Sequence, residues 1–176
     1  AARKQGFDAR AVHITANHHA GYFPGAEQMV LKLVYENGSG RVLGAQAAGG
    51  AGVDKRLDVV ATLMHFHGTV HDLAELDLAY APPFGSAKDP VHMAAFAAQN
   101  DLDGLARVMP PDADLTSFQV VDVRDAEEIE QLPLPQAPQA ILIPLDDLRE
   151  RLGELNPDLP TVVACQSGLR SYLGTR

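Results

Sequence analysis

Residues 76–90 decide how the first part of the chain folds, and they read Leu76-Asp77-Leu78-Ala79-Tyr80-Ala81-Pro82-Pro83-Phe84-Gly85-Ser86-Ala87-Lys88-Asp89-Pro90. The two adjacent prolines fix φ and remove two backbone donors, so this segment must run extended or turn. Asp89 followed by Pro90 predicts the start of a helix, with Asp89 as its N-cap. Two interpretations of Tyr80 stay open: it packs on the prolines of a surface loop, or the loop presents its phenol to a site.

The residues on either side of this loop predict an antiparallel sheet followed by helices. Apolar and β-rich runs predict strands at residues 11–16, 29–36 and 41–47, and Asn37-Gly38-Ser39-Gly40 predicts the turn of a hairpin. Apolar residues three and four apart predict helices at 54–67 and 90–100, with a shorter helix at 69–75 between them. This order of elements is typical of an α+β domain.

A second unit is predicted after a break near Pro110, where Met109-Pro110-Pro111-Asp112 interrupts the helical pattern. Short apolar runs predict buried strands at residues 118–123, 140–144 and 161–164, with helices at 126–131 and 145–155. Strands that alternate with helices indicate a parallel α/β sheet, whose sites lie beyond the carboxyl ends of the strands.

Cys165, the one cysteine in the chain, follows the last of these strands. Gly168 lets the loop turn tightly, so that backbone N–H groups can converge on the sulfur. The start of the next helix and the charge of Arg170 add positive potential. Each feature favours the thiolate and lowers the pKa of the cysteine. The alternative is an inert core cysteine, which requires none of these surroundings.

The composition excludes several classes of function. The chain has 176 residues, 46% of them hydrophobic, and a formal net charge of −9, so it has no basic footprint for nucleic acid. No apolar run approaches the ~20 residues of a membrane span. A single cysteine fits a reducing cytoplasm. The histidines lack a Cys pair or a His-Glu-x-x-His frame, so no metal site is predicted. Both ends read as interrupted elements, so we expect a fragment of a longer protein.

Residues 1 to about 100 resemble the C-terminal dimerisation domain of flavin-dependent pyridine nucleotide-disulfide oxidoreductases, above all the coenzyme A-disulfide reductases. The resemblance rests on these motifs: Tyr22-Phe23-Pro24-Gly25, Leu43-Gly44-Ala45-Gln46, Gly52-Val53-Asp54-Lys55-Arg56, Tyr80-Ala81-Pro82-Pro83 and Ser86-Ala87-Lys88-Asp89-Pro90. It implies a homodimer through residues 1–110, in which Tyr80 and Tyr22 reach across to the catalytic thiol and the bound coenzyme A substrate. The alternative for Tyr22 is a packed aromatic at a strand entry. His92 and Ala95 depart from the expected asparagine and glycine.

The loop from Cys165 to Arg170 resembles the active-site loop of rhodaneses, which are sulfurtransferases, as do Asp122-Val123-Arg124 and Ile143-Pro144-Leu145. This implies that residues 111–176 form a rhodanese-like domain, incomplete at its C-terminus. Cys165 would carry sulfur as a persulfide, and Arg170 would hold the anion with the loop residues Gln166, Ser167, Gly168 and Leu169. The Cys-x5-Arg spacing of phosphatases is absent, because Ser171 follows Arg170. Residues 132–138 depart from the expected Gly-His-Ile-Pro-Gly-Ala.

Together the two resemblances imply the C-terminal portion of a cytoplasmic FAD- and NAD(P)H-dependent reductase, joined to a sulfurtransferase thiol. Its substrates would be disulfides or persulfides of coenzyme A-type thiols. The flavin and nicotinamide sites would lie on a catalytic core outside these residues, so no cofactor is expected on this chain alone. One alternative is a non-catalytic dimerisation and substrate-delivery module with a vestigial rhodanese domain. Another is a relative of phosphatases or arsenate reductases.

Overall fold

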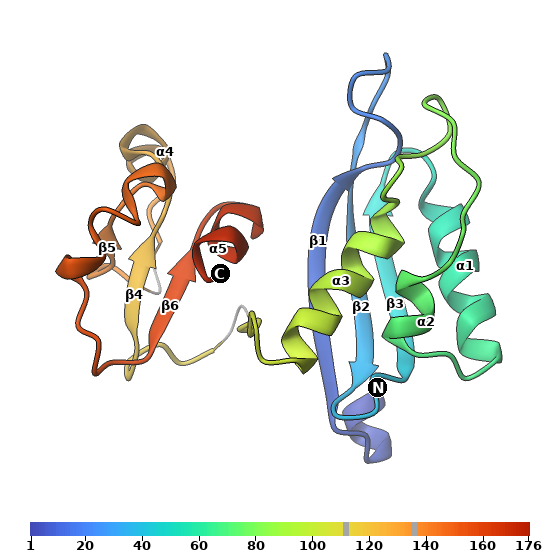
Figure 1. The fold of residues 1–176 in the computed structure, drawn as a ribbon, viewed down its shortest axis with the longest axis horizontal. Coiled ribbons are helices and arrows are strands. Elements are labelled where there is room, and N and C mark those ends of the chain that lie inside the picture. The colour runs from blue at the N-terminus through green and yellow to red at the C-terminus, as the bar shows by residue number, and fades with distance from the viewer. Residues whose placement is uncertain (111–112, 135–136) are drawn as a thin grey trace. The chain divides into compact units, whose positions relative to one another are not determined.

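The computed structural model describes residues 1–110, 113–134 and 137–176 (Figure 1). The chain divides into two compact units, Ala1–Val108 and Met109–Arg176, each with its own hydrophobic core. The predicted break near Pro110 falls beside this division, although Pro111 and Asp112 of its motif lie outside the described residues. Pro135 and Gln136 of the segment 132–138 lie outside them too. No helix of the described ranges combines the length and the apolar character that a membrane span needs.

The first unit contains an antiparallel sheet, as predicted, and its strands lie in the order β1-β2-β3. Its strands are β1 (Ala9–Asn17), β2 (Gln28–Glu36) and β3 (Val42–Gly49), preceded by a 3-10 helix over Ala2–Gln5. The hairpin register pairs Tyr35 with Val42 across the predicted turn. Because side chains alternate along a strand, Leu31, Leu33 and Tyr35 of β2 share one fully buried face.

Helices α1 (Val53–His65), α2 (Val70–Ala74) and α3 (Pro90–Leu102) complete this unit. Helix α3 packs against β1 and β2, and α1 packs against β3 (Figure 1). Asp89 caps α3 as predicted: its carboxylate accepts the N–H of Val91 at 3.2 Å, and Pro90 takes the first helical position. His92, which departs from the family pattern, contacts Leu76 O through Nε2 at 2.8 Å and so ties α3 to the preceding loop.

The second unit contains a parallel sheet in the order β5-β4-β6. Its elements are β4 (Gln119–Asp122), α4 (Ala126–Gln131), β5 (Ile141–Leu142), β6 (Thr161–Ala164) and α5 (Leu169–Gly174). Its core is formed by Val121, Val123, Ile143 and Leu148, and Cys165 packs against the edge of this cluster. The sheet therefore brings the end of β4 and the end of β6 side by side.

The predicted helix over residues 145–155 is wrong. Two 3-10 helices take its place, Leu145–Asp147 and Leu152–Glu154, with turns between them. A glycine in a helix costs about 1 kcal/mol relative to alanine, and Gly153 lies inside the predicted segment. The leucines also do not form one buried stripe, because Leu148 is buried whereas Leu152 is 54% exposed.

Candidate functional site

The two predicted tyrosines meet in the structure, although 58 positions separate them in the sequence. Tyr22 lies in the loop between β1 and β2, and Tyr80 lies in the loop between α2 and α3. Their hydroxyl oxygens are 3.0 Å apart and form a hydrogen bond. Tyr22 is 78% exposed and Tyr80 is 48% exposed, so neither is a packed core aromatic. The pair presents two phenols at the surface.

The hydrogen bond also affects the acidity of Tyr80. It raises the pKa of Tyr80 above its ordinary value, because the hydrogen bond with Tyr22 favours the neutral phenol. A phenol with a raised pKa stays protonated at neutral pH and can donate to an anion. The arrangement can therefore act as a proton or hydrogen-bond donor.

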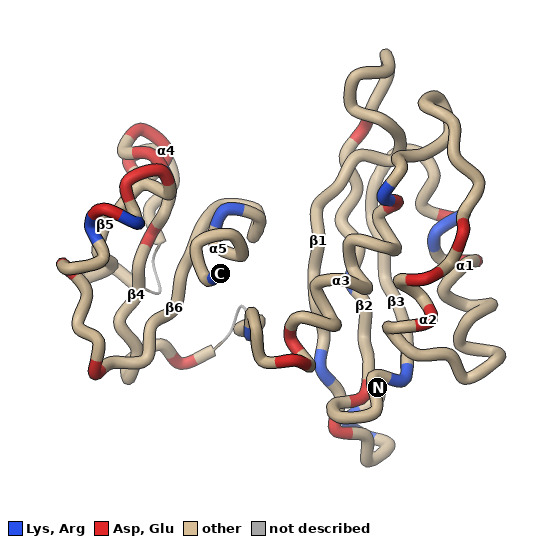
Figure 2. Tube along the Cα trace, in the orientation of Figure 1, with Lys and Arg blue, Asp and Glu red and all other residues tan. Residues whose placement is uncertain are grey.

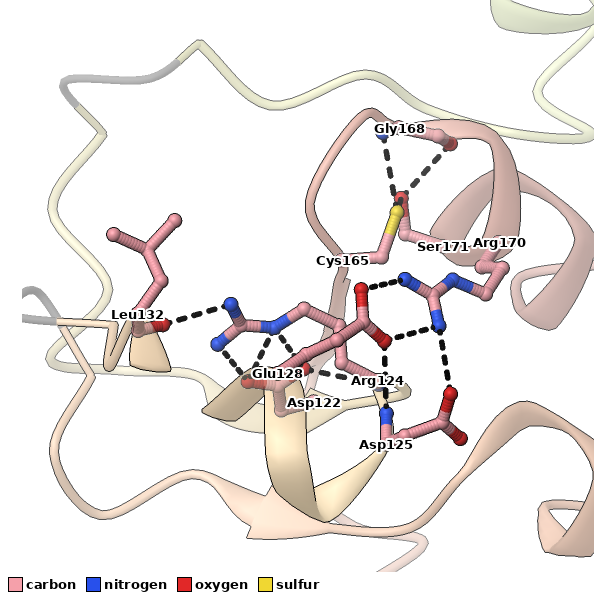
Figure 3. A network of polar contacts seen from close by, with 9 residues as sticks. All are labelled: Asp122, Arg124, Asp125, Glu128, Leu132, Cys165, Gly168, Arg170 and Ser171. Atoms are coloured by element: carbon pink, nitrogen blue, oxygen red, sulfur yellow. Dashed lines mark hydrogen bonds and ion pairs between the residues drawn. The ribbon is translucent and has the colours of Figure 1, made fainter. Parts of the chain in front are cut away.

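Cys165 follows β6 directly, and its loop is built around the sulfur (Figure 3). Gly168 adopts φ 94°, which a residue with a side chain rarely does, and its N–H donates to Cys165 Sγ at 3.1 Å. Ser171 Oγ lies 3.5 Å from the same sulfur and donates to Gly168 O at 3.0 Å. The predicted loop residues Gln166, Ser167 and Leu169 are exposed. The Gly168 N–H thus donates to the sulfur, and the thiol donates to Ser171 Oγ.

These contacts make Cys165 more acidic. Partial burial of the sulfur opposes ionisation. The hydrogen bond with the Ser171 hydroxyl and those from the N–H groups of Ser171, Gly168 and Ser167 outweigh it, and the pKa of Cys165 is lowered. A lowered pKa increases the thiolate fraction, and the thiolate is the nucleophilic form. The loop can therefore hold a reactive sulfur anion.

Arg170 has partners that sequence reasoning missed. Its guanidinium forms two hydrogen bonds of 2.7 Å to the carboxylate of Glu128 and lies 3.6 Å from Asp125 Oδ2 (Figure 3). The hydrogen bonds with Arg170 lower the pKa of Glu128 to about 2. The predicted role of Arg170 in holding a substrate anion stays a prediction, because the structure pairs its charge with carboxylates. Neither Glu128 nor Asp125 stands near Cys165 in the sequence, so only the fold could reveal this contact.

Glu128 and Asp125, the partners of Arg170, lie in an acidic segment next to a buried ion pair. Figure 2 shows acidic residues gathered along α4, and acidic and basic residues side by side in the turns after β5. Below α4, Asp122 and Arg124 form a bidentate pair with side chains only 1% exposed, and Arg124 also donates to Leu132 O at 2.8 Å. This pair fixes the end of β4 and the last turn of α4. Arg170 and Glu128 thus connect the cysteine loop to α4, and Arg124 joins the end of α4 to β4.

The described residues contain neither a cluster of metal ligands nor the glycine-rich motif of a dinucleotide site. No group of three or more His, Cys, Asp or Glu side chains within the described ranges is arranged to hold a metal ion. The turn after β4 reads Asp122-Val123-Arg124-Asp125, without the glycines that let a pyrophosphate approach a helix N-terminus. The sheet of the first unit is antiparallel and lacks a βαβ turn. No residue within the described ranges is therefore assigned to FAD or NAD(P)H.

The fold and the tyrosine loops define the class of protein. Residues 1–91 match the family model described as pyridine nucleotide-disulphide oxidoreductase, dimerisation domain, and the chain belongs to this family. Among curated proteins, the coenzyme A disulfide reductase of Staphylococcus aureus (strain bovine RF122 / ET3-1) is 39% identical over 93 residues, which are 53% of this chain and 21% of that protein.

Two solved structures match nearly the whole chain. Reduced Bacillus anthracis CoADR-RHD superposes with a TM-score of 0.91 at 40% identity, over 99% of this chain and 31% of that chain. An NAD-dependent persulfide reductase from A. fulgidus superposes with a TM-score of 0.84, also at 40% identity and with the same coverage. The chain thus spans about a fifth of the curated relative and about a third of these structures.

Proposed function

We propose that this chain provides the dimerisation unit and a sulfur-handling unit of a flavin-dependent NAD(P)H reductase for disulfides or persulfides of coenzyme A-type thiols. In this proposal residues 1–110 form the dimerisation domain and residues 111–176 form a rhodanese-like domain. The family of residues 1–91 and the likeness to a coenzyme A disulfide reductase and a persulfide reductase support it. FAD and NAD(P)H belong to parts of the enzyme other than the residues described here.

The tyrosines serve the reductase in this proposal. Two copies of the chain pair through residues 1–110, and Tyr22 and Tyr80 of one copy face the active-site thiol of the other. When the substrate disulfide is cleaved, a coenzyme A-type thiolate leaves and takes up a proton. The Tyr80 phenol, which is protonated at neutral pH, donates a hydrogen bond or the proton to that sulfur.

Cys165 carries out sulfur transfer in this proposal. Its thiolate attacks the outer sulfur of a persulfide R–S–SH, the S–S bond of the donor breaks, and R–S⁻ leaves with the bonding electron pair. The outer sulfur is then bound to Cys165 as a persulfide. An acceptor thiolate attacks that same outer sulfur, which regenerates the Cys165 thiolate and produces the acceptor's persulfide. No net oxidation occurs, so the step needs no cofactor.

One observation carries the sulfurtransferase part: the sulfur of Cys165 accepts the Gly168 N–H at 3.1 Å in a loop that lowers the thiol pKa. The test is the formation of thiocyanate from thiosulfate and cyanide. We expect activity in the native chain and none in Cys165→Ala. Ser117→Ala is the matched control, because Ser117 is an exposed residue of the same unit outside the cysteine loop. Equal rates in the native chain and in Cys165→Ala contradict the proposal.

A second candidate function has an observation in its favour. Arg170 is held by Glu128 and Asp125, so its charge is not free to hold a substrate anion. This favours a non-catalytic dimerisation and substrate-delivery module with a vestigial rhodanese-like unit. The two candidates differ in the same assay: the module binds coenzyme A-type ligands and forms dimers but produces no thiocyanate.

A further inference from the structure

The loops that carry the tyrosines have little packing around their tips. Residues 18–27 connect β1 to β2, and residues 75–89 connect α2 to α3. Two hydrogen bonds join the loops directly: Ala20 N donates to Gly85 O at 2.9 Å, and the hydroxyls of Tyr22 and Tyr80 are 3.0 Å apart. Since Tyr22 is 78% exposed, its position is set by the base of its loop rather than by side chains around the ring.

Arg56 of α1 lies at the base of both loops, and its side chain is almost completely buried. Its Nη2 donates to His18 O at 2.5 Å, at the start of the first loop. Its Nε and Nη2 donate to Asp89 Oδ1 and Oδ2 at 3.1 and 2.7 Å, at the end of the second loop. Its Nη1 donates to Gly52 O at 3.1 Å, next to its own helix. One guanidinium therefore joins the two tyrosine loops to α1.

Two neighbouring residues, Gly52 and Asp89, leave room for this guanidinium and hold it in place. Gly52 has φ 69°, and a Cβ at this position would lie 2.4 Å from Arg56 Nη1, so a side chain there displaces the guanidinium. Asp89 is itself fixed, because the same carboxylate caps α3 through Val91 N. The guanidinium of Arg56 thus lies between the fixed carboxylate of Asp89 and the backbone of Gly52, which has no side chain to displace it.

We propose that Arg56 is a positioning residue for the Tyr22–Tyr80 pair, because its buried guanidinium ties His18 and Asp89 together and thereby sets the separation of the two phenols. Its effect on catalysis rests on the proposed function, whereas its effect on the phenols does not. A lysine keeps the charge and can pair with Asp89. It lacks the planar fork that bonds the His18 carbonyl, the Gly52 carbonyl and the carboxylate at once.

The test reads the hydrogen bond between the phenols directly. The chain contains four tyrosines, so labelling with 3-fluorotyrosine gives four ¹⁹F signals, which single Tyr→Phe variants assign. We expect Arg56→Lys to lower the pKa of Tyr80 to the value found in Tyr22→Phe. We also expect that adding Tyr22→Phe to Arg56→Lys lowers it no further. The signal of Tyr35, which is fully buried in the core, shows whether the unit is folded.

The matched control is Arg10→Lys, which alters another Arg–Asp pair of the same unit, Arg10–Asp101 at 3.1 Å, and touches neither loop. It leaves the pKa of Tyr80 unchanged. A shift of the Tyr35 signal in Arg56→Lys would show that this variant unfolds the unit. In that case Gly52→Ala, which displaces the guanidinium without removing it, must lower the pKa of Tyr80 by the same amount.

A native pKa of Tyr80 in a folded Arg56→Lys or Gly52→Ala chain overturns the proposal. A negative thiocyanate assay concerns Cys165 alone and leaves this result untouched, so the two failures can be told apart.

Discussion

At the scale of single residues, the hydroxyl of Ser171 has one proton and two acceptors within reach. It donates to Gly168 O at 3.0 Å while Cys165 Sγ lies 3.5 Å away. Gly168 O also accepts the N–H of Tyr172 at 3.0 Å, so it keeps a partner when the hydroxyl turns away. Ser171 can therefore accept from the thiol and, after the thiol ionises, donate to the thiolate.

This arrangement predicts that Ser171→Ala raises the pKa of Cys165. The native hydrogen bonds favour the ionised form, so the native thiolate fraction is larger at any pH below the pKa, and the variant needs a higher pH to reach the same fraction. The rate of iodoacetamide alkylation against pH measures this, since Cys165 is the one cysteine in the chain. Ser171→Thr restores the native profile, and Ser167→Ala does not change it. Superimposed profiles for Ser171→Ala and the native chain contradict this role.

At the scale of elements, the start of α3 combines a helix cap with a buried ion pair. Asp89→Ala removes the acceptor for Val91 N and leaves Arg56 buried without its carboxylate. Breaking a buried pair by removing one partner costs about 3–5 kcal/mol. Asp125→Ala, at the N-cap of α4 but exposed, costs about 0.5–2 kcal/mol. Urea unfolding measures both, and equal losses would show that the buried pair adds nothing to the cap.

Local chemistry made most elements predictable. Asp89 and Pro90 mark the start of α3, Asn37-Gly38 marks the hairpin, and the predicted helix over residues 126–131 coincides with α4. The prediction for residues 145–155 failed because leucine spacing alone does not distinguish one helix from two 3-10 helices separated by a turn. Periodicity reports which residues are apolar, whereas the position of the sheet decides which of them are buried.

The candidate site was predictable only in part, for the same reason. Tyr22, Tyr80 and Cys165 stand in local motifs, so sequence reasoning could single them out. Arg56 and Glu128 act through partners 33 and 42 positions away, and no local pattern marks such a pairing. Ser171 was visible beside Arg170, but its contact with the sulfur depends on the turn that Gly168 makes.

At the scale of the whole molecule, the two cores share no residue. We therefore expect each unit to unfold as its own transition. Leu31→Ala and Ile143→Ala each remove a fully buried side chain, which costs about 2–5 kcal/mol. Hydrogen exchange should quicken in β1, β2 and β3 for Leu31→Ala, and in β4 and β6 for Ile143→Ala. Faster exchange in all of these strands for either variant would show a single cooperative unit.

The ion pair between Arg170 and Glu128 has a consequence for protein design. Transplanting the hexapeptide from Cys165 to Arg170 into a foreign parallel sheet would transfer the nucleophile without the carboxylate that anchors its loop. The smallest portable module therefore consists of two segments, the cysteine turn and the first turn of α4, borne on adjacent strands of the recipient scaffold.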